Sequence, residues 1–213
     1  LVLFLLFHMS MNLAAVFSTE AYNAICEFLG ANWYALAGTL ILAAGVVVHL
    51  VYATVLTLHN RSSRGSQRYA MTAEPEGVTW ASRNMYVLGI IIVLGLLLHL
   101  YNFWYNMQFA EIIGNHELGP FPPADGAAYI AALFSSPVYC IIYLVWFAAI
   151  WFHLTHGFWS AFHTIGWDNQ TWLPRLKRIA NVVATIVFLC FALVVIVFYL
   201  RSLGVCGGSC AGF

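Results

Sequence analysis

Charged side chains are scarce in this sequence. Asp, Glu, Lys and Arg together make up 8% of its 213 residues, whereas a soluble domain carries about 25%. A surface so poor in charge cannot face water on every side, which excludes an ordinary soluble protein. The formal net charge is zero, so no basic surface for nucleic acid is expected. With 62% hydrophobic residues and a mean hydropathy of +0.84, most of the chain is expected to face a lipid bilayer.

Asp, Glu, Lys and Arg are missing altogether from five apolar stretches, at residues 1–17, 33–58, 84–110, 138–163 and 179–200. The last four reach the ~20 residues that a helix requires to cross a bilayer. The first is shorter, and because the chain begins inside an apolar run without Met, we expect its start to be missing. Backbone groups in lipid must bond within their own segment, so each stretch is predicted to be helical. The expected fold is all-α: residues 1–213 form a single domain, an integral membrane bundle of five transmembrane helices.

Positive charge is absent from the first and third connections, residues 18–32 and 111–137. Seven of the eight Lys and Arg lie in the second and fourth connections, residues 59–83 and 164–178. Because cytoplasmic loops retain positive charge, those two connections are predicted to be cytoplasmic. The N-terminus is then cytoplasmic and the C-terminus lies outside. The third connection also predicts a short surface helix near residues 127–134.

Five histidines lie deep inside the apolar stretches: His8, His49, His99, His153 and His156. Ionisable groups at that depth are costly and usually mark a function. Counted along helices that rise 1.5 Å per residue, His49 and His156 fall in the cytoplasmic half of the bilayer, and His8 and His99 in the outer half. The sequence therefore predicts two histidine pairs at two depths, with each pair shared between two different helices.

Such pairs suit b-type haem, whose iron takes one imidazole from each side of the porphyrin and is held between facing helices. No Cys-x-x-Cys-His occurs, so covalent c-type haem is not expected. We therefore predict two stacked b haems enclosed by the first four helices, with iron ligands His8, His49, His99 and His156. His153 lies three residues before His156 on a nearby face. It is an alternative ligand, or a hydrogen-bond partner of a haem propionate or a quinone.

Three charged residues are further candidates for the cofactor site. Arg61 and Arg64 are predicted to pair with haem propionates or with a partner subunit, because guanidinium binds carboxylates in a bidentate manner; the alternative is that they only fix the topology. Quinone chemistry requires proton exchange, and Glu27 is a hypothetical quinone-site residue if that site is on the outer side. The alternative for Glu27 is a solvated loop acid.

Two stretches resemble a known family. Residues 153–167, HLTHGFWSAFHTIGW, look like the fourth helix of the dihaem cytochrome b subunit of succinate dehydrogenase and fumarate reductase. His49 followed by residues 60–69, NRSSRGSQRY, looks like that family's second helix and cytoplasmic loop. Five helices, with His on each of the first four and none on the fifth, also resemble this family. The resemblance covers essentially the whole chain.

The resemblance implies that His49 and His156 ligate the inner haem and that His8 and His99 ligate the outer one. It also implies a bacterial cytoplasmic membrane and a complex in which an iron–sulfur subunit and a flavoprotein subunit dock on the cytoplasmic face. The chain is then expected to anchor a succinate–menaquinone oxidoreductase and to pass electrons to quinone without touching succinate. In one respect the sequence departs from some members, which carry Glu two residues before the fourth-helix ligand; here that position is Leu154.

Two other functions are compatible with a histidine-bearing helical bundle. One is the membrane cytochrome b of a nitrate reductase type enzyme, whose four ligands come from two helices. His49 with His59 and His153 with His163 satisfy that count, but His8 and His99 then have no role. The other is a haem-free transporter with a histidine-lined path, against which the lack of acids and bases in the apolar stretches argues.

Overall fold

The computed structural model describes residues 1–30, 32–63, 79–167 and 169–205, and every regular element in these ranges is helical. In chain order the elements are α1 (Val2–Phe17), α2 (Thr19–Gly30), α3 (Trp33–Ser63), α4 (Trp80–Arg83), α5 (Met85–His99), the π-helix η1 (Leu100–Phe109), α6 (Ala110–Ile113), α7 (Gly126–Phe134), α8 (Pro137–Thr164) and α9 (Trp172–Ser202). The predicted all-α class is confirmed.

In the described part of the chain, four continuous helices are long and apolar enough to cross a membrane. Three are α3, α8 and α9, and the fourth is the run from Met85 to Ile113, which joins α5, η1 and α6. They contain four of the five predicted stretches. Helix α1, with 16 residues, is apolar but shorter than a span. Helix α9 starts earlier than predicted because Pro174 lies in its first turn, where a missing N–H has no helical partner to lose.

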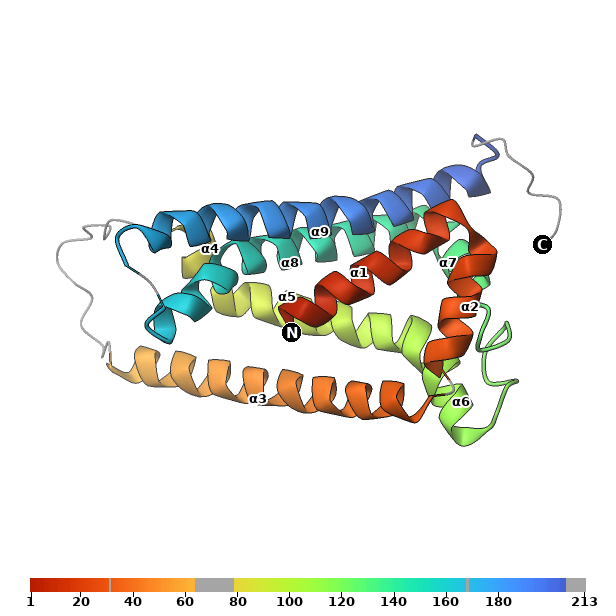
Figure 1. Ribbon diagram of the computed structural model, residues 1–213, viewed down its shortest axis with the longest axis horizontal. Helices are drawn as coiled ribbons and strands as arrows, with labels where there is room; N and C mark the ends of the chain where they lie inside the picture. The colour runs from red at the N-terminus through yellow and green to blue at the C-terminus, as the bar shows by residue number, and fades with distance from the viewer. Residues whose placement is uncertain (31, 64–78, 168, 206–213) are drawn as a thin grey trace.

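Helices α8 and α9 pack along most of their length and form the centre of the bundle (Figure 1). Their shared core includes Tyr143 and Phe147 on α8 and Val195 and Phe198 on α9, all at most 7% exposed. The Trp151 indole donates to the Thr185 hydroxyl across the same interface at 3.0 Å. In a bilayer, helices associate through such close van der Waals packing and through interhelical hydrogen bonds, so this pair forms the core of the bundle.

Helix α1 lies against α9 and is fixed at its C-terminal end by one arginine. The Arg201 guanidinium donates to the carbonyl oxygens of Val16, at 2.7 Å, and Ala15, at 3.4 Å. These are among the last carbonyls of α1, which have no partner inside the helix. A cation at a helix C-terminus is also favoured by the helix dipole. Arg201 therefore fixes the position of α1 along α9.

Two short helices, α2 and α7, close one end of the bundle (Figure 1). The predicted helix near residues 127–134 is confirmed as α7, but six of its nine residues are buried rather than at the surface. Helix α2 lies in a connection for which no helix was predicted. The Asn23 amide of α2 donates to Asp125 at 2.7 Å, and its oxygen accepts the Ala127 N–H at 2.9 Å. Asp125 also caps α7 by accepting the Ala128 N–H. We refer to this end as the α2/α7 end and to the opposite end, which holds α4, as the α4 end.

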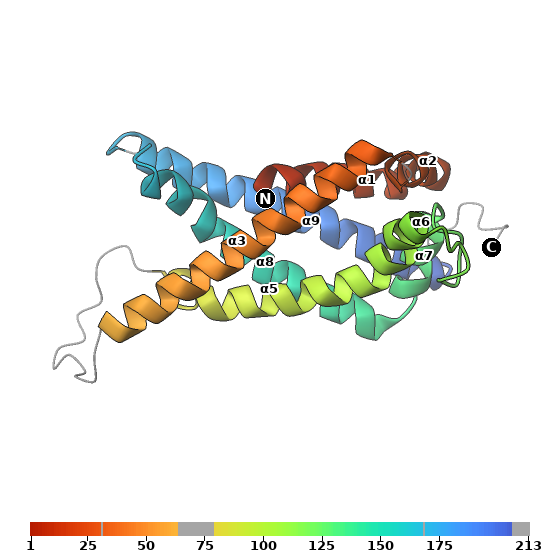
Figure 2. The same ribbon diagram turned by 90° about the horizontal axis from the view of Figure 1, so that it is seen from below.

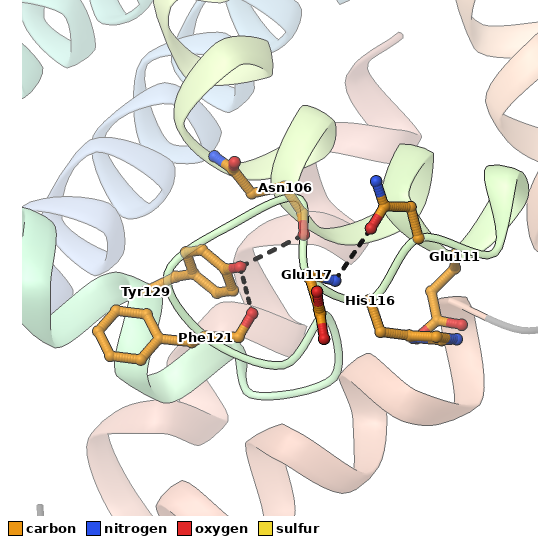
Figure 3. A network of polar contacts seen from close by, with 7 residues as sticks. Asn106, Glu111, His116, Glu117, Phe121 and Tyr129 are labelled. Carbon is orange, nitrogen blue, oxygen red and sulfur yellow. Dashed lines mark hydrogen bonds and ion pairs between the residues drawn. The ribbon is translucent and has the colours of Figure 1, made fainter.

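The connection from α6 to α7 is held by a network of polar contacts (Figure 3). The Tyr129 hydroxyl donates to the carbonyl oxygen of Phe121 at 2.7 Å and lies 3.4 Å from that of Asn106. His116 lies 3.7 Å from Glu111 and pairs with it when protonated. The loop is therefore anchored to both η1 and α7.

Helix α3 is the least packed of the long helices. It has no buried residue, and Figures 1 and 2 show it crossing the molecule along one side, away from α9. Among the described residues, one side-chain hydrogen bond joins it to another helix: the Thr39 hydroxyl donates to Gln108 Oε1 at 2.9 Å. The same oxygen accepts from the Trp104 indole at 2.9 Å, which fixes the orientation of the Gln108 amide.

Replacing Thr39 by Val should weaken the attachment of α3, because the substitution removes the hydroxyl at constant side-chain volume. We expect Thr39→Val to lower the free energy of unfolding in detergent by about 1 kcal/mol, the scale of interhelical hydrogen bonds in membranes. The matched control is Thr57→Val, whose hydroxyl bonds only to the Ala53 carbonyl of its own helix. Equal losses in the two variants would contradict the assigned role.

Candidate functional site

The structure brings four of the five deep histidines together as two interhelical pairs. His8 of α1 and His99 at the end of α5 have ring centroids 5.7 Å apart, with ring planes at 83°. His49 of α3 and His153 of α8 have centroids 6.1 Å apart, with planes at 80°. Each pair joins two helices, and no histidine is shared between the pairs.

The two pairs lie at different levels of the bundle, and α8 shows this most directly. Trp146 of α8 packs against His99 with a centroid separation of 5.6 Å, while His153 of the same helix faces His49. From Trp146 to His153 the helix axis advances about 10 Å at 1.5 Å per residue. The His8–His99 pair is therefore displaced toward the α2/α7 end, as the predicted sorting by depth requires.

Aromatic side chains surround the His8–His99 pair. Phe4 stacks on His8 at 5.4 Å, and His99 contacts Phe103 at 5.2 Å and Tyr143 at 6.3 Å. The π-helix η1 begins directly after His99, and such turns occur often at functional sites. This pair therefore packs against aromatic rings from α1, η1 and α8.

Gly95 is the reason that Trp146 can approach α5 so closely. A Cβ atom added at position 95 would lie 2.1 Å from the Trp146 ring. The same indole donates to the Ile92 carbonyl at 3.0 Å, and its ring packs on His99. The absence of a Cβ at Gly95 thus leaves room for the Trp146 ring, which packs against His99.

His153, rather than His156, is the α8 residue that faces His49. The His156 ring packs instead on Trp159, with centroids 4.9 Å apart. Three residues advance a helix by about 300°, so the two histidines lie on neighbouring but distinct faces. The sequence analysis paired His156 with His49 and named His153 as the alternative; in the structure it is His153 that faces His49.

Several imidazole nitrogens in the described part of the chain lack a hydrogen-bond partner. The Nδ1 atoms of His99, His153 and His156 are buried, and no protein group accepts from or donates to them. A buried polar atom without a partner costs about 1–3 kcal/mol. These positions are therefore poorly explained as interhelical hydrogen bonds and are better explained as ligands or as contacts of a bound group.

The histidine pairs fit a metal held between two axial imidazoles. With metal–nitrogen bonds of about 2 Å and roughly 1.2 Å from nitrogen to ring centre, two opposed imidazoles have centroids about 6.4 Å apart. The observed separations, 5.7 and 6.1 Å, are slightly shorter than this value. Among the described residues no three His, Cys, Asp or Glu gather to hold a bare ion, and a porphyrin supplies the remaining four nitrogens itself. The donor set therefore suits haem rather than zinc.

A polar chain that the sequence analysis missed leads from His8 to the α2/α7 end. Asn12 donates to the His8 carbonyl at 2.8 Å, and its amide nitrogen lies 3.4 Å from both ring nitrogens of His8. The Tyr22 hydroxyl of α2 donates to the Asn12 oxygen at 3.1 Å. Burial raises the pKa of Tyr22 well above its usual value, so Tyr22 remains a neutral donor. The i, i+4 spacing of His8 and Asn12 was the available signal.

The charged candidates lie apart from the histidine pairs. Arg61 is exposed in the last turn of α3, and Arg64 lies outside the described residues. Glu27 is exposed on α2 and lines a surface hollow with Glu20 and Asp125. No contact joins Glu27 to a histidine in the described structure. Its placement therefore gives no support for a quinone-site role.

Comparison with known proteins adds no family. No family model matches the chain, and neither a curated protein nor a solved structure matches it. The candidate site is therefore characterised by its own residues: four helices that each contribute one imidazole, paired at two levels of an apolar bundle.

Substituting Gly95 by Ala should disturb the His8–His99 pair, because the added methyl group collides with the Trp146 ring. We expect Gly95→Ala to lower the free energy of unfolding by about 1–3 kcal/mol, as overpacking does, with a change in tryptophan fluorescence. Gly89→Ala on the same helix is the matched control, since a Cβ there meets nothing within 4 Å. The control should change stability by less than about 1 kcal/mol. Similar losses in both variants would contradict this packing.

Proposed function

We propose that this chain is a dihaem b-type membrane anchor that conducts electrons across a bilayer to or from a quinone. One observation carries the proposal: two histidine pairs, each from two different helices, at separations suited to bis-imidazole iron. In this proposal the haem-bearing helices are α1, α3, α5 and α8. Haem, when bound, supplies reversible one-electron chemistry.

The chain's own residues have distinct parts in this proposal. His8 and His99 hold one iron, and His49 and His153 hold the other. His153 replaces His156 as the fourth-helix ligand because it is the residue that faces His49. The aromatic packing of Phe103 and Trp146 on His99 fixes that ring and excludes water from the site.

The choice of partner rests on sequence resemblance. The segments at residues 153–167 and 60–69 resemble the dihaem subunit of succinate dehydrogenase and fumarate reductase, and the anchor is therefore assigned to a succinate–menaquinone oxidoreductase. Its iron–sulfur and flavoprotein subunits dock at the α4 end, which the positive charges of residues 59–83 and 164–178 mark as cytoplasmic. The N-terminus is then cytoplasmic in a bacterial inner membrane. Menaquinone is the quinone that this family implies.

The proximity of His8 and His99 bears on the two alternatives. A nitrate reductase type cytochrome takes its ligands from two helices and leaves both residues without a role, whereas here their rings are 5.7 Å apart. A haem-free transporter requires a polar path, and the five apolar stretches contain no Asp, Glu, Lys or Arg to line one. Both observations favour the dihaem anchor.

The optical spectrum of the purified native complex tests the proposal. We expect succinate to raise a b-haem band in the difference spectrum against the oxidised complex. A band raised by dithionite alone would support bound haem but contradict the assignment to a succinate–menaquinone oxidoreductase. If neither reagent raises a band and extraction yields no haem, the proposed function is wrong.

Histidine substitutions test the ligand assignment in the same complex. Ala at His8, His99, His49 or His153 should lower haem content to about half, because each pair holds one of two irons. His156→Ala tests the alternative iron ligand on α8 and should retain both haems, because His153 is the residue that faces His49. Loss of haem in His156→Ala with retention in His153→Ala would reverse the assignment.

A further inference from the structure

A cluster of cationic and aromatic side chains lies beside the inner histidine pair, where α8 packs on the start of α9. The Lys177 ammonium lies 4.6 Å from the Trp159 ring centroid, and Trp159 packs on His156 at 4.9 Å. Lys177 and His156 thus contact the same indole ring. Both residues are half-buried. Three residues from two helices thus form one small polar group within an apolar bundle.

This cluster has no acidic partner in the described part of the chain. Lys177 makes no ion pair there, and His156 Nδ1 is buried without a hydrogen bond. The described acids, Glu20, Glu27, Glu111, Glu117 and Asp125, all belong to α2, α6 or the loop before α7, at the opposite end. A partly buried ammonium and an adjacent unpartnered imidazole are stabilised by an anion that binds both.

The position of the cluster identifies which anion suits it. Along α8, His156 lies three residues, or about 4.5 Å, beyond His153 toward the α4 end. A porphyrin held at the level of His153 carries two propionate carboxylates at its edge. Carboxylates avoid the hydrocarbon and turn toward the nearer aqueous side, which for this pair is the α4 end. The cluster therefore lies where those carboxylates are expected.

We infer that Lys177 and His156 bind a propionate carboxylate of the haem held by His49 and His153, with Trp159 positioning the ammonium. This inference rests on the proposed function. It gives His156 a role other than iron ligation and places the principal propionate contact on α9 rather than on Arg61 or Arg64. Because carboxylate and phosphate share this recognition chemistry, an anionic phospholipid is the competing occupant.

Infrared spectroscopy of the native complex separates these cases. Haem carrying ¹³C-labelled propionate carboxyls is incorporated, and label-sensitive carboxylate bands are recorded in the redox difference spectrum. Lys177→Met and His156→Phe should each shift one such band. Arg175→Met is the matched control, because it also removes one positive charge. The Arg175 side chain is two residues from Lys177 and exposed, and its guanidinium carbon lies 5.2 Å from the Trp172 ring centroid. The control should leave every band unchanged.

The outcomes distinguish the inference from the function on which it rests. Unchanged bands in Lys177→Met and His156→Phe, with haem content retained, overturn the inference and leave the proposed function intact. An equal shift in Arg175→Met also overturns it, because the effect is then general electrostatics. If Lys177→Met loses a co-purifying anionic phospholipid while the bands stay unchanged, the lipid is the occupant. Absence of haem from the wild-type complex overturns both proposals.

Discussion

A neutral imidazole buried in hydrocarbon has two ring nitrogens and no water with which to satisfy them. The five deep histidines share this constraint, and the apolar stretches that hold them contain no acid or base to act as partner. Two pairs of rings face one another across helices, yet Nδ1 of His99 and of His153 remains unpartnered. Hydrogen bonding between the facing rings therefore does not account for these pairs.

The two histidine pairs are built on parts of the bundle that differ in packing. The α8–α9 core, with α1 fixed at its C-terminus by Arg201, gives the His8–His99 pair a rigid aromatic wall. The other pair depends on α3, which has no buried residue and is joined to η1 through Thr39 and Gln108. Because His49 lies on that helix, the separation of the second pair depends on how α3 is held against the bundle.

Hydropathy predicted the long helices well and the amphipathic ones poorly. The apolar stretches fall within α1, α3, the run from α5 to α6, α8 and α9. Helix α2 was missed because Glu20, Asn23 and Glu27 make it read as a polar connection, although its Tyr22 is buried against the bundle. Its helical state is stabilised by tertiary contacts with α7, which a single-sequence pattern does not contain.

The sequence by itself predicted that most of the chain faces lipid, that the fold is all-α, and that histidines lie at two depths. Hydrophobic length and a fixed rise per residue suffice for these. The tertiary structure alone decided that His153 rather than His156 faces His49, that Trp146 occupies the space beside Gly95, and that Lys177 of α9 meets Trp159 of α8. The depth of a residue in the bilayer follows from counting along its own helix. Which neighbouring helix its side chain faces depends on the rotation of each helix about its axis, and that rotation is set by packing against neighbours.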